Sequence, residues 1–472
     1  MKYLLAILFI VFSLGCTKKS IQKTDITNQI KTNVWANVPD EANTEEFPTW
    51  WKSFKSEELN QLVAKSLNQN WDLRTAWANL KKMEAINMSN YSLNKPAVGL
   101  DGQAKRTFTD NDINSSSVNL FSLAPSVGWE IDLWGKLKNT QRASVLDVSA
   151  SRFEIESTAL LVTSSVTSTW LNIKYLESLV DLLDQQIATS RTLLDLVETK
   201  FSQGLGNALQ VLQQRQQMIA VEARKPATIR DLESYKNKLS VLLGKSPGTI
   251  DLYPSRMPEL PLFPKMIDAK TLFARRPDLQ ALTAKIKAQD HRVQAALLSK
   301  LPNLKINLSW AFSATSLNDI FESTIGTILG SSSYSIFDNK KQEALVLQNK
   351  SQLEELLSIL GSKYLDILTE IQNGITNEKY YREESLQVDE QIHLAKLNLN
   401  EAKNRYLNGL IEYAEVITAI QTLQSLERTM INIKNLTLIN RVELYKSLGG
   451  HWEDLIKEPK PLVKIKQTMR SY

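Results

Sequence analysis

The stretch from about residue 138 to 202 carries mostly apolar positions at alternating steps of four and three. The positions of this seam are Val162, Val166, Thr169, Ile173, Leu176, Val180, Leu183, Ile187, Ser190, Leu194, Val197 and Phe201. Such a seam is typical of helices that pack as a coiled coil. A helix of about 60 residues is roughly 90 Å long. The pattern therefore predicts an elongated helical protein, and an extended soluble coiled coil would explain the seam equally well.

Shorter stretches alternate with a period of two, as a two-faced strand requires. Strands are expected at about 96–109 and 118–134, and within about 302–337. Apolar Leu304, Ile306, Leu308, Trp310 and Phe312 alternate with Lys305, Asn307, Ser309 and Ala311, and Trp129, Ile131 and Leu133 alternate with Glu130, Asp132 and Gly135. Beyond the amino terminus, no apolar run reaches the roughly 18 residues of a membrane-spanning helix. A bilayer could be spanned only by a closed barrel shared between chains, and a soluble sheet capping a helical bundle is the alternative.

The glycine and proline breaks between the expected elements recur after about 205 residues, which indicates an internal duplication. Gly204 and Gly409 each end a long helical stretch, and Pro96 and Pro302 each precede a strand. Each copy has the order helix, two strands, very long helix, glycine turn and returning helix. The predicted domains are a first copy at 49–250, with an opening helix at about 56–94, a second copy at 251–455, and a tail at 456–472.

The amino terminus predicts export. Lys2 is followed by an apolar run of about ten residues, which is the length of a signal-peptide core and too short to cross a bilayer. The run ends in Ser13-Leu14-Gly15-Cys16, which resembles the bacterial lipoprotein box, although Leu is more usual at the place of Ser13. The predicted division is a signal peptide at 1–15 and a lipidated tether at 16–48, with diacylglyceryl and N-acyl chains on Cys16 and no other cofactor. A plain signal peptide with an incidental thiol is the alternative.

Charge and composition narrow the classes of function. The 56 basic and 51 acidic residues are scattered along the 472 positions, so no basic block predicts a nucleic-acid partner. Three His and one Cys have no metal-ligand spacing. The chain carries no Ser/His/Asp order and no phosphate-binding glycine loop, so an enzyme is not expected.

Several motifs in order resemble those of the TolC-like outer-membrane efflux proteins, in the lipoprotein branch that serves resistance-nodulation-division pumps. They are Trp50-Trp51-Lys52-Ser53-Phe54, Gly128-Trp129-Glu130-Ile131-Asp132-Leu133-Trp134-Gly135-Lys136, Arg275-Arg276-Pro277-Asp278-Leu279, Ser335-Ile336-Phe337-Asp338 and Leu444-Tyr445-Lys446-Ser447-Leu448-Gly449-Gly450-His451-Trp452. The order of the motifs, more than any one of them, carries the resemblance.

The resemblance implies a mainly α fold with a membrane β part: an internally duplicated, long α-helical coiled-coil barrel, plus four strands contributed to a trimeric, twelve-stranded outer-membrane β-barrel. It implies a homotrimer in the bacterial outer membrane, lipid-anchored and extending into the periplasm. Substrate would pass passively from an inner-membrane pump of the resistance-nodulation-division type, through a periplasmic adaptor, to the exterior. A periplasmic lipid-anchored coiled-coil adaptor or scaffold is the competing hypothesis, and the exported compound stays open.

The helix turns are the expected closing end of the tunnel, because they are farthest from the strands. Family members carry a ring of acidic residues there, and the matching positions are Glu415 and Thr418, with Gln210 and Gln213 in the first copy. Only Glu415 is acidic, and a solvated helix face is its alternative reading. The turns are expected to dock the adaptor through Gly204, Leu205, Gly206, Gly409, Leu410 and Ile411.

Overall fold

A computed structural model describes residues 35, 49–111, 114–250, 252, 256–268, 271–450, 455–460 and 462. All of them belong to one compact unit, Val34–Tyr472. The predicted signal peptide and Cys16 lie outside the described residues. Within the predicted tether, Trp35 donates a hydrogen bond from Nε1 to the carbonyl oxygen of Ile267, 2.7 Å away.

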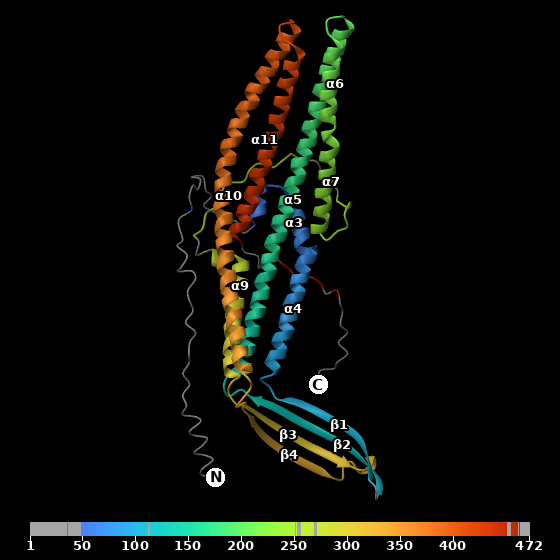
Figure 1. Cartoon of the computed structure of the whole chain (residues 1–472), viewed down its shortest axis with the longest axis vertical. Helices are drawn as coiled ribbons and strands as arrows, with labels where there is room; N and C mark the ends of the chain where they lie inside the picture. Colours follow the sequence, from blue (N-terminus) through green and yellow to red (C-terminus); the bar gives the residue numbers. More distant parts are fainter. Residues whose placement is uncertain are drawn as a thin grey trace. The chain divides into compact units, whose positions relative to one another are not determined.

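The first copy is mainly helical around two strands (Figure 1). Its elements are η1 (Trp50–Phe54), α3 (Glu57–Gln69), α4 (Trp71–Ser92), β1 (Ala97–Asn111), β2 (Asn114–Ile131), α5 (Lys136–Ser202), α6 (Ala208–Glu222) and α7 (Arg224–Leu242). The second copy repeats this order with α8 (Leu272–Arg275), α9 (Pro277–Leu298), β3 (Asn303–Ala314), η2 (Leu317–Asp319), β4 (Thr324–Ser333), α10 (Lys341–Leu407) and α11 (Tyr413–Leu448).

The predicted internal duplication is confirmed by the two long helices. Both α5 and α10 contain 67 residues, and Lys341 lies 205 positions after Lys136. The helix starts are also alike: Asp132 accepts hydrogen bonds from the backbone nitrogens of Leu137 and Lys138 before α5, and Asp338 accepts one from Gln342 before α10. An acidic side chain at this position satisfies backbone donors and complements the helix dipole.

The predicted single opening helix is wrong, because the chain breaks at Asn70. The Asn70 side chain accepts hydrogen bonds from the backbone nitrogens of Asp72 and Leu73, at 2.8 and 3.1 Å. Its own amide donates to the carbonyl oxygen of Leu242 at 3.0 Å. Asn70 therefore ends α3 and caps α4, which is the usual role of Asn beside a helix start.

The returning helix of the first copy is also broken, whereas α11 is continuous. The chain leaves the helix at Ala223, between α6 and α7. Pro226 follows at once, and proline cannot donate a hydrogen bond to the carbonyl of Glu222 four residues before it. Ile431, which lies 205 positions later, lets α11 run through the matching point.

The four strands form one antiparallel sheet in the order β1-β2-β3-β4. β2 begins at Asn114 rather than at the predicted 118, and it ends at Ile131, so Leu133 lies outside the strand. The register pairs Val98 with Val127, Trp129 with Ile306, and Leu308 with Ile328. Because paired residues of antiparallel strands share a face, these side chains line one side of the sheet.

The sheet is therefore two-faced. The apolar face carries Val98, Leu100, Phe108, Phe121, Leu123, Val127, Trp129, Leu304, Ile306, Leu308, Trp310, Phe312 and Ile328. No part of the chain that the structure describes covers this face: Val98 is 81% exposed and Ile328 is 80% exposed. Polar side chains predominate on the other face, which also carries Leu120, Ile325 and Leu329.

The hydrophobic core lies where the opening helices of the chain meet α5 and α11. Trp50 stacks on Tyr445 with ring centroids 5.5 Å apart. Lys174 on α5 is fully buried, and its ammonium lies 3.2 Å from Glu58 and 3.1 Å from Glu177. A buried charge needs such partners, because its desolvation is otherwise costly.

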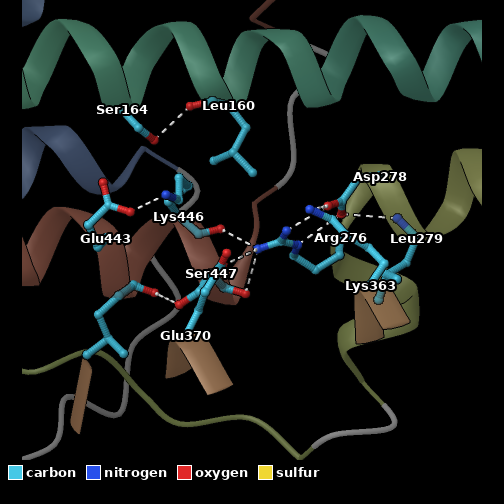
Figure 2. A network of polar contacts seen from close by, with 11 residues as sticks. Leu160, Ser164, Arg276, Asp278, Leu279, Lys363, Glu370, Glu443, Lys446 and Ser447 are labelled. Carbon is cyan, nitrogen blue, oxygen red and sulfur yellow. Dashed lines mark hydrogen bonds and ion pairs between the residues drawn. The ribbon is translucent and has the colours of Figure 1, made fainter. Parts of the chain in front are cut away.

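Arg276 joins the end of α11 to the start of α9 (Figure 2). Its guanidinium donates to the carbonyl oxygens of Lys446 and Ser447, each at 3.1 Å, and to the carboxylate of Asp278 at 2.9 and 2.6 Å. Burial alone would raise the pKa of Asp278, but the hydrogen bonds and charge of Arg276 hold it below its usual value. A cation at a helix end and an anion at a helix start both suit the helix dipoles.

Two of the sequence motifs, far apart in the chain, meet at this contact. Gly449 has φ of +81°, and a Cβ built there would lie 2.5 Å from the carbonyl oxygen of Arg275. The backbone nitrogen of Gly450 donates to the same oxygen at 3.4 Å. The Arg-Arg-Pro-Asp-Leu motif and the Leu-Gly-Gly motif are therefore two halves of one structural contact.

Candidate functional site

Two tight glycine turns end the long helices. Gly204 has φ of +74° and Gly409 has φ of +72°, a conformation that glycine adopts without steric cost. Each glycine nitrogen donates to a carbonyl three residues back at 3.0 Å, and the nitrogens of Leu205 and Leu410 donate to carbonyls five residues back at 2.9 Å. This is the Schellman arrangement, which satisfies the last carbonyls of a helix.

The two returning helices begin differently. Before α6, the side-chain oxygen of Asn207 accepts a hydrogen bond from the backbone nitrogen of Gln210 at 3.1 Å. Before α11, Glu412 makes no side-chain cap, and the backbone nitrogen of Glu415 donates to the carbonyl oxygen of Glu412 at 3.2 Å. The two turns thus have the same backbone hydrogen bonds, but only the helix that follows the first turn has a side-chain N-cap.

A shared apolar cluster holds the two turns at the same end of the helices. It contains Leu193 and Val197 of α5, Leu399, Ala402 and Tyr406 of α10, and Tyr413, Val416, Ala419 and Ile420 of α11. The rings of Tyr406 and Tyr413 lie 4.9 Å apart, and the ammonium of Lys200 lies 4.4 Å from the centre of the Tyr406 ring. Burial, followed by the nearby Tyr406, raises the pKa of Tyr413. Its phenol therefore stays neutral at physiological pH.

The predicted gate residues divide into two pairs. Glu415 and Thr418 are exposed on the first turns of α11. Gln210 is half-buried and accepts a hydrogen bond from the hydroxyl of Tyr406 at 3.1 Å, and Gln213 is half-buried as well. Throughout the described residues, no hydrogen bond or ion pair joins the side chains of one pair to those of the other.

Glu415 lies close enough to Arg405 to act on its charge. The pKa of Arg405 is raised, first by its hydrogen bond to Glu401 at 2.7 Å and by the charge of Glu401, and then by the charge of Glu415. Arg405 is thus paired with Glu401, and Glu415 adds only a small electrostatic contribution to it.

Sequence reasoning missed a buried glutamine seam between the two hairpins. Gln214 accepts from the Tyr413 hydroxyl at 2.9 Å and donates to the carbonyl of Ser190 at 2.8 Å. Gln217 accepts from Gln421 at 2.7 Å and donates to Gln424 at 3.1 Å. A signal existed: each returning helix carries a pair of glutamines three residues apart, Gln214 and Gln217 in α6 and Gln421 and Gln424 in α11.

The predicted docking residues differ in accessibility. Leu205 and Leu410 are each 71% exposed, although both are apolar. Gly204 and Gly409 are exposed, whereas Gly206 and Ile411 are half-buried. The two leucines at the helix turns are therefore accessible to another molecule, whereas Gly206 and Ile411 are partly covered.

Two further features are absent from the described residues. No helix there combines the length and the apolar character needed to cross a membrane. In the same part of the chain, His, Cys, Asp and Glu nowhere gather in a group of three that could hold a metal ion.

Comparison with known proteins identifies related chains. A family model described as outer membrane efflux protein matches residues 62–245 and 269–450, one stretch in each copy. The pyoverdine export outer membrane protein OpmQ of Pseudomonas putida is 24% identical over 415 residues, covering 86% of this chain and 88% of the relative. The probable outer membrane lipoprotein SilC of Salmonella typhimurium is 20% identical over 409 residues, covering 85% and 88%.

Solved structures show the same fold. The outer-membrane channel OprN superposes with a TM-score of 0.84 at 22% identity, covering 89% of this chain and 96% of that one. The CmeC outer membrane channel of Campylobacter jejuni gives 0.80 at 23% identity, covering 87% and 90%. The resemblance drawn from the sequence motifs is therefore confirmed: the chain belongs to the outer membrane efflux protein family.

Proposed function

We propose that three copies of this chain form the outer-membrane duct of a tripartite export system. The duct leads passively from a periplasmic adaptor and an inner-membrane pump of the resistance-nodulation-division type to the exterior. The observation that carries the proposal is the apolar face of the sheet, which the chain itself leaves uncovered. Relatives named for the export of pyoverdine and the efflux of toluene support an export role.

The dimensions of the sheet suit a bilayer. The strands contain between 10 and 18 residues, and about 9 to 11 tilted residues span the hydrocarbon core. β1 and β4 are the outer strands of the sheet, and each has one unpaired edge. Unpaired backbone groups are not tolerated in lipid, so the edges need strands from other copies. Three copies supply twelve strands, an even number within the range of closed barrels.

The two faces of the sheet would then divide between lipid and water. The apolar face would contact lipid, and the face with Asp101, Lys105 and Asn307 would line an aqueous lumen. A periplasmic adaptor or scaffold, the competing function, would leave the apolar face without a partner. An exposed apolar face of this size argues against that alternative.

Adjacent residues of β4 test this assignment. Ile328→Lys places a charge on the proposed lipid face, and we expect it to cost about 2–4 kcal/mol near the bilayer midplane. Thr327→Lys places the same charge on the proposed lumen face and is expected to be tolerated. The measurement is the yield of heat-modifiable trimer in the outer-membrane fraction. Equal yields from the two variants, or a wild-type chain recovered as a soluble monomer, would overturn the proposal.

Lipid attachment at Cys16 is the second part of the proposal, and the lipoprotein box supports it. Several acyl chains at about 0.8 kcal/mol per buried methylene anchor a protein stably. Wild-type protein is expected to incorporate radiolabelled palmitate, whereas Cys16→Ala is not. Labelling of the Cys16→Ala protein would rule out this site of attachment.

The turn of α11 is proposed to close the duct. Three copies of Glu415 around one axis would repel one another and attract cations. Thr418 lies one turn further along, and Gln210 and Gln213 would contribute neutral side chains. The neighbouring Arg405 would temper the repulsion within each copy. The repulsion that opposes closure would thus be weaker than in an all-acidic ring.

Single-channel recording tests the gate. Glu415→Gln removes three negative charges from the trimer, and we expect lower cation selectivity and weaker block by Mg²⁺. Glu383→Gln on α10 is the control, because that carboxylate is exposed and lies 24 positions before the end of α10 at Leu407, away from the turn that carries Glu415. Selectivity and block that match the wild type in Glu415→Gln would remove Glu415 from the gate.

The helix turns are proposed to dock the helical hairpins of the adaptor, through Gly204, Leu205, Gly206, Gly409, Leu410 and Ile411. The exposure of Leu205 and Leu410 supports this role. A photocrosslinking residue at either leucine is expected to capture the adaptor in intact cells. Failure at both positions, with capture elsewhere on the helices, would move the docking surface.

A further inference from the structure

A groove between α6 and the upper part of α11 gathers two arginines with no acidic residue in its lining. The groove is open to solvent and has a volume of about 630 Å³, with Gln217 and Arg224 on one side and Gln421 and Arg428 on the other. Gln421 and Arg428 lie seven positions apart on the continuous α11 and so share one helix face. Across the groove, Arg224 at the start of α7 follows Gln217 of α6. We call this cavity the Arg224/Arg428 groove.

The two guanidinium groups belong to one groove whose lining contains no carboxylate. Burial lowers the pKa of Arg428, and the like charge of Arg224 lowers it further, whereas Glu427 outside the groove raises it. Arg428 donates one hydrogen bond to the side-chain oxygen of Gln186 at 2.9 Å. In the part of the chain that the structure describes, the Arg224 side chain makes no hydrogen bond or ion pair. Like charges placed together in this way gain from a shared anion.

Neutral donors complete the groove. Gln421 donates to Gln217 at 2.7 Å, and Gln217 donates to Gln424 at 3.1 Å. An amide nitrogen carries two N–H groups, so each of these two glutamines has a second N–H to offer. The hydrogen bonds between them also fix the distance between the helices that carry the two arginines.

We propose that the Arg224/Arg428 groove binds a small oxyanion with more than one negative charge, a carboxylate or a phosphate compound. Guanidinium groups match both kinds of oxyanion with paired hydrogen bonds. The cavity has the size of a small-molecule site. This inference goes beyond the proposed function, because binding is a property of the folded protein and needs no transport.

Calorimetric titration of the purified full-length protein with citrate and with inorganic pyrophosphate, at constant ionic strength, tests the site. Wild-type protein is expected to bind at least one of them, and the one that binds identifies a carboxylate or a phosphate ligand. Arg224→Gln and Arg428→Gln are each expected to weaken binding about tenfold or more. Arg224→Lys keeps the charge and is expected to retain part of the affinity.

Arg230→Gln is the matched control, because Arg230 lies on α7 only six positions from Arg224 and pairs with its neighbour Asp231 at 2.8 Å. Its affinity is expected to stay within about twofold of the wild type. Arg224→Gln remains informative if Arg428→Gln folds poorly, since only Arg428 supports another side chain. Absence of binding by both probes, or equal losses in Arg224→Gln and Arg230→Gln, would overturn the site.

Discussion

Backbone hydrogen bonding at the edges of a sheet is the constraint on which this structure depends. The four strands satisfy one another in the interior of the sheet, but β1 and β4 each keep one open edge. An open edge is a template for pairing with another chain. The sheet therefore has unpaired backbone groups at its edges and an apolar face that is exposed to water. Both are removed if copies of the chain pair edge to edge in lipid. The duct that we propose is the simplest arrangement that removes both.

The strands are connected in pairs to two very long helices. Each copy of the repeat supplies two strands and one helix of 67 residues, so the strands enter and leave the helical part as pairs. Capping carboxylates at Asp132 and Asp338 start the long helices directly after the strands. Arg276 joins the end of α11 to the start of α9 in the second copy.

The features that depend on local sequence could be predicted. The glycine turns at 204 and 409 and the alternation of the strands arise from neighbouring positions, and the structure contains both. The offset of about 205 residues follows from comparing these local patterns in the two halves of the chain. Features that depend on a distant partner could not be predicted. Asn70 accepts from the backbone nitrogens of Asp72 and Leu73, and it also donates to the carbonyl of Leu242, 172 positions away. The motif arginine Arg276 donates to carbonyls about 170 positions away.

The candidate site divides in the same way. The glycine turns and the charge of Glu415 follow from spacing and residue type. The glutamine seam does not, because glutamine is ordinarily a surface residue. Its burial arises only when two returning helices, which come from different copies of the repeat, lie side by side.

Pro226 gives the duplicated hairpins different mechanical properties. A helix that is interrupted at one point bends there, whereas a continuous helix distributes a bending load along its length. The first hairpin is interrupted at Ala223, and α11 of the second is not. The two hairpins, which are copies of one unit, therefore differ in stiffness. The same force applied at both helix turns would displace the first hairpin more than the second.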